Sequence, residues 1–382
     1  MGSMLPKPIL SKVVDRAGSS YIGATCVSVN GYRTSMEDAH VMLVENDMSL
    51  LGVFDGHNGG GCSGYIAAHL PDKVKSLNGN FGQVELEHVC VSLDCEFVRE
   101  VGDSSGSTGT FCLITRDYNV TVCNVGDSRT LIARDGRIIF ATEDHKPTNP
   151  SERERIEASG GCVVSNRVDG DLAVSRSFGD TSFKHRDVGE DYKNQKVIAV
   201  PDVNKIACRA GDVVILACDG VFEGSFSNEE VVAFVHQHIA KCTDLAVVAA
   251  RVCDEAIRRG SKDNISCLIA RLNDGTSAAR AFGAHSFLPG PPFPRTHEAS
   301  RVAYAAMAQL AKMSTAEALN ARYALLMAYE RKTLSSKSPL EQTAFEMSDE
   351  TDIETEKSFF GRGPAPGNEA AFFQSLADNG GK

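Results

Sequence analysis

The sequence predicts an α+β fold, in which antiparallel strands and helices occupy different stretches of the chain. Three apolar runs within residues 110–134 are separated by short turns at 116–117 and 126–128, which is typical of an antiparallel meander. Two further apolar runs end in Asp55-Gly56 and Asp219-Gly220, and both are interpreted as buried strands closed by a turn. Stretches with helical spacing lie between and after these strands.

Apolar runs bounded by turn residues define the expected strands. Residues 1–20 precede the first of them and contain two prolines, so they are expected to be an irregular lead-in. The first strand is closed by Asn30-Gly31, a strong turn signal. The expected strands span residues 21–29, 41–44, 48–54, 110–115, 118–125, 129–134, 212–218 and 265–272.

Helical spacing and capping signals define the expected helices. The first has apolar residues at helical spacing from position 66 onward. The capping-box pairs Ser151/Glu154 and Ser314/Glu317 mark the starts of two others. The polar stretch 165–200 has no regular pattern, and so long an excursion usually serves a function. The expected helices span residues 59–80, 86–101, 151–159, 229–239, 245–258, 298–311 and 316–331.

The composition divides the chain into three predicted parts. Residues 1–274 contain all the motifs described below. A linker and a helical hairpin follow over 275–335, because the proline-rich run 288–294 fits neither a helix nor a central strand. Residues 336–382 are rich in Ser, Glu and Gly and are expected to be a mobile tail. We expect the hairpin to brace the main domain, with recruitment of partners as the alternative.

Charge and cysteine content narrow the class of protein. A net charge of −11 argues against nucleic acid as a ligand. The 12 cysteines form no CxxC pair and several lie in apolar runs, which favours a reducing compartment. No apolar segment is long enough to span a bilayer. Gly2 invites N-myristoylation, but Pro6 stands where that pattern has Ser or Thr. We expect a cytoplasmic monomer, with nuclear or membrane association as alternatives.

The stretch from Gly52 to Gly61 carries the first candidate functional residues. Asp55 offers hard oxygen ligands to a metal at the end of a buried strand. Gly56 lets the backbone bend so that its carbonyl can face the same ion, and His57 can titrate near neutral pH. The alternative for Asp-Gly-His alone is a tight turn with a surface histidine.

Several acidic residues share this position at a strand end or in a tight turn. Two strands that each deliver an aspartate at the same end can place carboxylates close together. Clustered carboxylates repel one another unless a cation or protons compensate, and ligand sets made only of oxygen favour Mg or Mn over Zn. Each aspartate alone could be a turn or helix cap, but so many positions favour a metal site. The residues are Glu37, Asp38, Asp55, Asp127, Asp219 and Asp263.

Seven motifs follow one another along the chain: GYRTSMEDAH, GVFDGHNGG, VGDSR, EDHKPTNPSERERIEASGG, LAVSRSFGD, VILACDGVFE and KDNIS. In this order they resemble the motifs of the metal-dependent serine/threonine protein phosphatases, the PPM or protein phosphatase 2C family. The resemblance covers about residues 21–272 and implies a four-layer α-β-β-α sandwich of two antiparallel sheets flanked by helices, here with a C-terminal helical extension. It also implies hydrolysis of phosphoserine and phosphothreonine in proteins by a hydroxide that bridges two Mn or Mg ions.

The resemblance also assigns metal ligands. Asp55 would bridge both ions, and Asp219 and Asp263 would complete the shell of the first. The second ion would take the Gly56 carbonyl and, directly or through water, Glu37. Asp38 would support these ligands from behind.

Three further roles follow from the resemblance. Arg33 would grip the phosphate with its bidentate fork, and His57 would give a proton to the leaving alkoxide. Without the resemblance, Arg33 would be interpreted as a surface salt bridge to Glu37, and His57 as a loop histidine. Arg176, within the 165–200 excursion, would belong to a flap that touches substrates.

One position departs from the family pattern. The family usually has Asp where this chain has Glu223, and that Asp helps the aspartate equivalent to Asp127 hold a third metal ion. We therefore expect a third site that is weaker and mostly hydrated. Two rival functions stay open at this point, a catalytically dead relative that binds phosphoproteins and a metal-dependent phosphohydrolase acting on small molecules.

Overall fold

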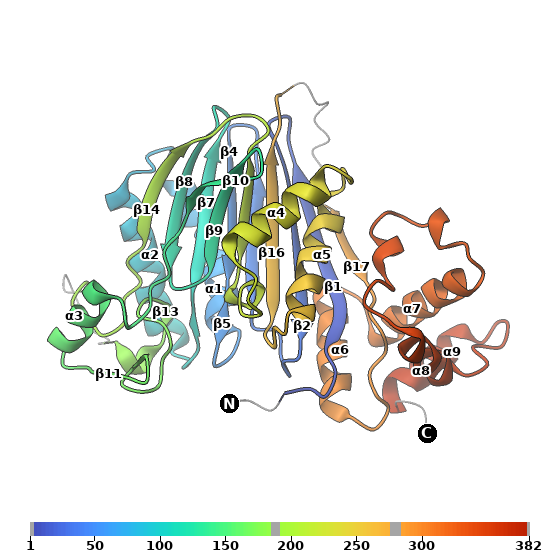
Figure 1. Cartoon of the computed structure of the whole chain (residues 1–382). Coiled ribbons are helices and arrows are strands. Elements are labelled where there is room, and N and C mark those ends of the chain that lie inside the picture. The colour runs from blue at the N-terminus through green and yellow to red at the C-terminus, as the bar shows by residue number, and fades with distance from the viewer. Residues whose placement is uncertain (1–3, 185–191, 276–283, 380–382) are drawn as a thin grey trace.

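Two antiparallel sheets stacked face to face form the centre of the structure, a computed structural model that describes residues 4–184, 192–275 and 284–379 (Figure 1). The seven-stranded sheet has the order β10-β9-β15-β16-β2-β1-β17, and the five-stranded sheet has the order β14-β8-β7-β4-β3. Their strands are β1 (Ile9–Gly18), β2 (Ile22–Gly31), β3 (Ala39–Val44), β4 (Met48–Phe54), β7 (Gly109–Thr115), β8 (Asn119–Val125), β9 (Arg129–Arg134), β10 (Arg137–Ala141), β14 (Asp202–Ala207), β15 (Val213–Ala217), β16 (Ile265–Leu272) and β17 (Ala284–Leu288).

Smaller strands surround one end of this pair of sheets. A three-stranded sheet has the order β13-β6-β5, and a separate two-stranded ribbon is formed by β11 and β12. Their bounds are β5 (Gly56–His57), β6 (Gly106–Ser107), β11 (Val163–Val164), β12 (Arg167–Val168) and β13 (Phe178–Gly179).

Alternation of side chains along the strands builds two cores from each sheet. Along β16, Leu268 and Ala270 face the other sheet, where they share a core with Leu51 of β4. The intervening Cys267 and Ile269 face the opposite way, into the core beneath the helices. A strand buried on both faces reads as a continuous apolar run, which is why 265–272 was predictable.

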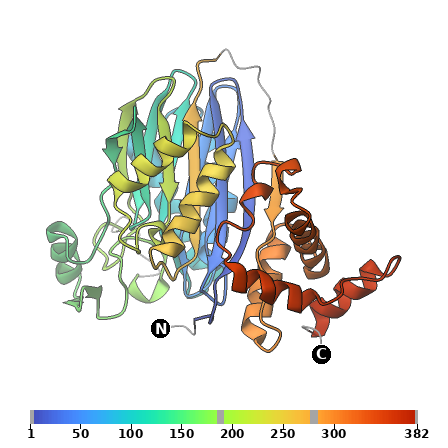
Figure 2. The ribbon, with the colours of Figure 1, turned by 45° about the vertical axis from the view of Figure 1, so that its right-hand side comes forward.

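Helices cover the outer face of each sheet. The helices α1 (Gly61–Ser76) and α2 (Gln83–Glu96) pack on the five-stranded sheet, while α4 (Asn228–Ile239) and α5 (Leu245–Arg258) pack on the seven-stranded sheet. Figure 2 shows α4 and α5 lying across the face of their sheet. The order helices, sheet, sheet, helices confirms the predicted four-layer α-β-β-α sandwich.

Three local predictions are wrong. The expected meander ends after β8, because the turn at 126–128 carries the chain across to the other sheet, where β9 pairs with β15 and β10. The expected lead-in contains β1, which pairs with β2. The helix α3 (Pro150–Ala158) has no side-chain cap from Ser151, since it begins at Pro150 with Asn149 at the N-cap, and proline suits the first helical position.

The C-terminal part extends the seven-stranded sheet and its core. The strand β17 pairs antiparallel with β1, so it covers the edge that β1 would otherwise expose (Figure 1). Four helices follow, and the capping box of Ser314 and Glu317 is present at the start of the second. They are α6 (Glu298–Leu310), α7 (Thr315–Glu330), α8 (Glu350–Phe360) and α9 (Glu369–Asn379).

Residues 350–379, expected to lie in a mobile tail, form two of these helices. Phe360 and Phe373 are buried and belong to the same core as the seven-stranded sheet and α5. A fully buried ion pair fastens α7 to α8, where the Arg322 guanidinium donates to Glu356 Oε1 and Oε2 at 2.6 and 2.8 Å. Removing one partner of such a pair usually costs about 3–5 kcal/mol, because the other charge stays buried. The division of the chain at 274 and 335 stays a prediction.

Candidate functional site

Acidic side chains from the ends of several strands meet in one cleft of about 540 Å³. Asp55 follows β4, Asp219 follows β15, and Asp263 precedes β16. These strand ends lie together because β15 and β16 are antiparallel neighbours and β4 packs on them from the other sheet. The predicted residues that line the cleft are Arg33, Glu37, Asp55, Gly56, His57, Asp127, Asp219, Glu223 and Asp263.

The two glycines of the Asp-Gly motifs are required by close approach of other backbone. A Cβ atom at Gly56 would lie 2.3 Å from the Glu37 carbonyl oxygen. A Cβ atom at Gly220 would lie 2.1 Å from the Asn264 carbonyl oxygen. Glycine therefore lets each strand end press against the segment that carries another acidic residue.

Burial and mutual repulsion make the central carboxylates reluctant to ionise. Burial raises the pKa of Asp55 well above its ordinary value, and the charges of Asp219, Asp38 and Asp263 raise it further. Burial likewise raises the pKa of Asp219, with further contributions from Asp127 and Asp263. The pKa of Asp38 is raised to about 7, chiefly by burial. Such a set gains most from a bound cation, which removes the repulsion.

Two groups of potential metal ligands lie side by side in the described part of the chain. One oxygen each of Asp38 and Asp55 and the Cys218 sulfur lie within 4.8 Å of one another. A second group is formed by one carboxylate oxygen from each of Asp219, Glu223 and Asp263, and these atoms also lie within 4.8 Å of one another.

Unpartnered oxygens support an oxygen-ligated cation at this place. Both carboxylate oxygens of Asp38 and Oδ1 of Asp219 are buried without a hydrogen-bond partner among the described residues. Buried polar atoms are seldom left without a partner, and carboxylates are the ligands that Mg²⁺ and Mn²⁺ prefer. The residues present therefore fit a divalent cation.

Glu37 is oriented by its neighbours at the side of the cleft. Its two carboxylate oxygens accept hydrogen bonds from the Ser35 hydroxyl at 2.7 Å and the Gly59 amide at 3.2 Å. Its amide donates to Asn264 Oδ1 at 2.9 Å. These bonds hold the Glu37 backbone against Gly56.

Arg33 lies at the mouth of the cleft and pairs with Asp263 instead of Glu37. Its Nη2 donates to Asp263 Oδ2 at 2.5 Å, and about half of its side chain is exposed. Burial lowers the pKa of Arg33, but the charge and hydrogen bond of Asp263, together with the charges of Glu223 and Asp55, raise it, with a net increase. The guanidinium has further donors that can face a ligand in the cleft.

His57 is held by Asp180, a residue that the sequence analysis did not single out. Nε2 of His57 lies 2.8 and 2.9 Å from the two Asp180 carboxylate oxygens. Burial lowers the pKa of His57, while the hydrogen bond and charge of Asp180 raise it, with a net increase. A Cβ atom at Gly106 would lie within 2.3 Å of both side chains, so only glycine leaves room for this pair. The sequence contained one signal for this residue, because Asp180 is the last residue of the motif LAVSRSFGD.

The two residues expected to hold a third ion both line the cleft but have different partners. The Asp127 carboxylate is paired with the Lys146 ammonium, a cleft residue that the sequence analysis missed. Glu223 instead belongs to the group with Asp219 and Asp263, and it accepts from the Lys262 amide at 3.4 Å.

Arg176 lies in the 165–200 excursion but does not line the cleft. Its guanidinium donates to Glu152 at 2.7 Å, to Asp202 at 2.9 Å and to the Val200 carbonyl at 3.0 Å. These bonds tie the excursion to α3 and β14. Other residues of the excursion do line the cleft, among them Arg167.

Comparisons with known proteins agree with this geometry. The sequence profile of the family "Protein phosphatase 2C" matches residues 22–265. Protein phosphatase 1B of Rattus norvegicus is 33% identical in an alignment of 296 positions that covers 70% of this chain and 75% of that protein. Protein phosphatase 1A of Homo sapiens is 33% identical over 293 residues, with the same two shares. The crystal structure of a phosphatase from a pathogenic strain of Toxoplasma gondii aligns with a TM-score of 0.66 and 30% identity, covering 72% of this chain and 99% of that one.

Proposed function

Because the chain belongs to the protein phosphatase 2C family, and is therefore a metal-dependent phosphatase of phosphoserine and phosphothreonine in proteins, we propose that the acidic cleft is its catalytic site. The observation that carries this proposal is the set of buried carboxylates around Asp55, with unpartnered oxygens on Asp38 and Asp219. Arg33 and His57 border the same cleft.

The site would hold two divalent cations, Mn²⁺ or Mg²⁺. Asp55, Asp219 and Asp263 would hold one of them, and Asp55, the Gly56 carbonyl and Glu37 would hold the other, with Asp38 supporting Asp55. When bound, the ions supply neutralisation of phosphate charge and a water of lowered pKa as the nucleophile.

Arg33 and His57 would act on the phosphate ester itself. Arg33 would bind two phosphate oxygens with its planar fork while the neighbouring Asp263 keeps the guanidinium at the mouth of the cleft. His57 would protonate the leaving serine or threonine oxygen. Its Nε2 faces Asp180, so Nδ1 is the nitrogen that can give this proton, and Asp180 acts as a positioning residue.

Turnover measurements test the proposed function directly. We expect the purified protein to release phosphate from phosphoserine and phosphothreonine peptides with Mn²⁺ present and to lose this activity when the metal is chelated. No turnover in saturating Mn²⁺ would favour a phosphoprotein-binding adaptor. Faster turnover of small phosphate esters than of every phosphopeptide would favour a small-molecule phosphohydrolase.

A third, weaker metal site would involve Asp127, Glu223 or both. Glu is one methylene longer than Asp, and Lys146 already neutralises Asp127, so an ion there would keep most of its waters. In calorimetric Mn²⁺ titrations, we expect Asp127→Ala and Glu223→Ala to weaken only the lowest-affinity binding event. If wild type and both variants bind the same number of ions with the same affinities, neither residue holds a metal.

Substitution of Arg33 should weaken substrate binding. We expect Arg33→Ala to raise KM for phosphopeptides by about tenfold or more, the usual effect of losing a charge-assisted hydrogen bond of about 1.5–3 kcal/mol. Arg33→Lys should restore KM only in part, because lysine lacks the fork. Inhibition by inorganic phosphate should weaken in parallel. Unchanged KM and phosphate inhibition in Arg33→Ala would reduce Arg33 to a salt-bridge partner of Asp263.

The remaining proposals concern location and assembly. All 12 cysteines are free thiols, which supports a reducing compartment such as the cytoplasm. We further propose that the enzyme acts as a monomer on phosphoproteins. None of the helices in the described ranges has the length and hydrophobicity needed to cross a bilayer. Gly2, the candidate for N-myristoylation, lies outside the described residues.

A further inference from the structure

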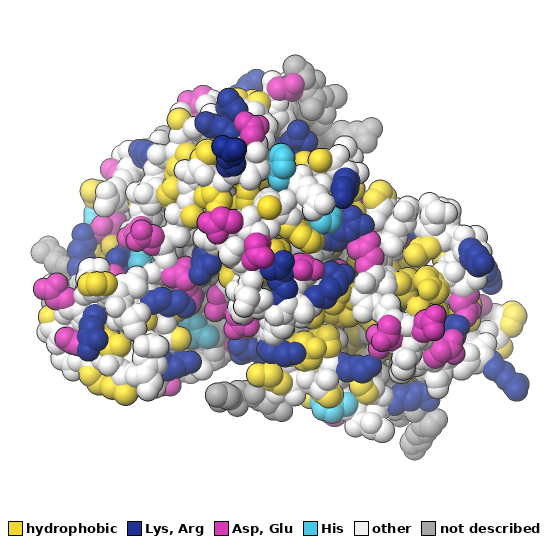
Figure 3. Space-filling view, in the orientation of Figure 1, with side chains coloured by type: hydrophobic (Ala, Val, Ile, Leu, Met, Phe, Trp, Pro, Cys, Tyr) yellow, Lys and Arg dark blue, Asp and Glu magenta, His cyan; other side chains and the backbone are white. Residues whose placement is uncertain are grey.

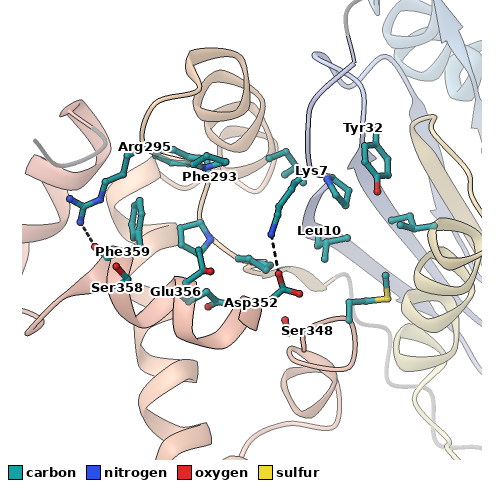
Figure 4. A pocket seen from close by; sticks show the side chains of 18 of the residues that line it. Lys7, Leu10, Tyr32, Phe293, Arg295, Ser348, Asp352, Glu356, Ser358 and Phe359 are labelled. Carbon is teal, nitrogen blue, oxygen red and sulfur yellow. Dashed lines mark hydrogen bonds and ion pairs between the residues drawn. The ribbon is translucent and has the colours of Figure 1, made fainter. Parts of the chain in front are cut away.

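A second cavity, of about 830 Å³, lies between the sandwich and the C-terminal helices, and we name it the C-terminal groove. One wall is formed by the N-terminal residues 7–10 with Tyr32, and the other by residues 291–295 and the face of α8. Figure 4 shows Leu10 and Tyr32 on one side, Phe293 and Phe359 on the other, and Lys7 reaching across to Asp352. Its volume is within the range of about 300–1,000 Å³ that is usual for ligand sites.

The groove and the catalytic cleft lie at the same end of the sandwich. Ile9 pairs with Gly31, and Ile265 pairs with Val29, so the start of β1, the end of β2 and the start of β16 meet at one sheet end. In Figure 1 this end of the sandwich points downwards, where β5 and β2 are labelled.

Two adjacent residues join the groove to the cleft. Tyr32 lines the groove, while Arg33, the next residue, lines the cleft. The Lys262 ammonium lies 3.7 Å from the centre of the Tyr32 ring, and Lys262 precedes Asp263 in the cleft. A bound polypeptide that leaves the cleft past Arg33 therefore reaches the groove across Tyr32 and Lys262.

The walls of the groove are mainly apolar. Aromatic, aliphatic and proline side chains supply most of the wall, and hydrophobic side chains are visible between the sandwich and the C-terminal helices in Figure 3. The charged side chains of the groove already have partners, since Lys7 pairs with Asp352, Arg258 with Glu255 and Glu356 with Arg322. An apolar surface rimmed by paired charges is typical of a site that binds a segment of another protein.

We propose that the C-terminal groove docks an apolar segment of the phosphoprotein substrate that lies outside the phosphorylation site. This inference rests on the proposed function. Docking of a second segment makes delivery of the phosphorylated residue to the cleft intramolecular, which raises its effective concentration without any change in the chemistry. The groove thus selects among phosphoproteins, and the cleft alone acts on short phosphopeptides.

Two threonines on α8 give a matched test. Thr355 is exposed and lines the groove, whereas Thr351, one turn earlier on the same helix, is exposed and does not line it. Thr355→Tyr should fill the groove, and Thr351→Tyr adds the same ring elsewhere. Because both positions are exposed, we expect both variants to fold, and their melting temperatures would check this.

The substrate would be a phosphorylated cell extract, used intact or digested with trypsin to short phosphopeptides, with dephosphorylation of each site followed by mass spectrometry. We expect Thr355→Tyr to slow a subset of sites in intact proteins by about tenfold or more, and to leave the same sites in the digest unchanged. The slowed proteins should share apolar segments, and Thr351→Tyr should match wild type throughout.

Two results would overturn the docking proposal. The first is equal rates for the two variants at every site of the intact proteins. The second is an equal slowing of intact proteins and digested peptides, because this would place the effect of Thr355→Tyr in the cleft. Failure of wild type to act on the digest in Mn²⁺ is a different outcome, and it would contradict the proposed function itself.

Discussion

Asp55→Asn should abolish nearly all phosphatase activity while the protein stays folded. Asp55 is the proposed ligand common to both ions, so the substitution removes a charge from both shells. The loss should exceed the roughly 10- to 100-fold reduction typical when a residue that merely supports a metal ligand is changed. The measurement is Mn²⁺-dependent turnover of a phosphopeptide, with Asp135→Asn, a change in an exposed turn, as the control.

Thermal stability gives this prediction a second readout. Burial and neighbouring carboxylates raise the pKa of Asp55, so its charged form opposes folding at neutral pH when no metal is bound. Asparagine removes that charge with little change of shape. In chelator, Asp55→Asn should therefore melt at the same temperature as wild type or higher, and Mn²⁺ should stabilise it much less. Near-normal turnover in the folded variant would contradict the two-ion site.

His57→Gln should slow hydrolysis of phosphoserine and phosphothreonine peptides by about 10²- to 10⁴-fold, the usual contribution of a general acid. An alkoxide is a poor leaving group and needs the proton, whereas the phenolate of p-nitrophenyl phosphate departs without one. The loss on p-nitrophenyl phosphate should therefore be much smaller. The measurement is the ratio of the turnover rate on phosphopeptides to the turnover rate on p-nitrophenyl phosphate, compared between wild type and His57→Gln.

Asp180→Asn tests whether Asp180, the hydrogen-bond partner of His57, affects catalysis through that histidine. We expect a loss of activity that is smaller than in His57→Gln and confined to the peptide substrates. Asparagine keeps a hydrogen-bonding group beside Nε2 of His57 but lacks the charge of the carboxylate. An equal loss on both substrates in His57→Gln would show that the histidine orients other groups in the cleft and does not supply the proton.

Residues whose role is announced by local sequence could be predicted. The strands before Asp55 and Asp219 are apolar runs closed by Asp-Gly, and both ends reach the cleft as expected. Asp180 ends one of the quoted motifs, but its pairing with His57 could not be found this way. Asp180 lies in a left-handed turn at φ 52°, 123 positions from His57 in the chain, and only the fold brings the two together.

The strand and helices that the sequence analysis missed were hidden for physical reasons. The strand β1 contains Lys12, a charged residue that hides the apolar pattern, yet Lys12 is buried at 2.8 Å from Asp254 of α5. The helices α8 and α9 lie in a polar stretch, where Glu356 is buried only because Arg322 meets it from another helix. Local pattern also cannot name the partner of β9, since both sheets accept a strand of that composition.

The pairing of β17 with β1 sets an order of events during synthesis. Ile9–Gly18 leaves the ribosome early and can join β2 at once, but its other edge has no partner until Ala284–Leu288 has been made. At about 5–20 residues per second, that interval lasts roughly 15 to 50 s. An unpaired strand edge is a template for pairing with other chains. During this interval the open edge of β1 exposes the nascent chain to aggregation, and translation of the C-terminal part ends that period.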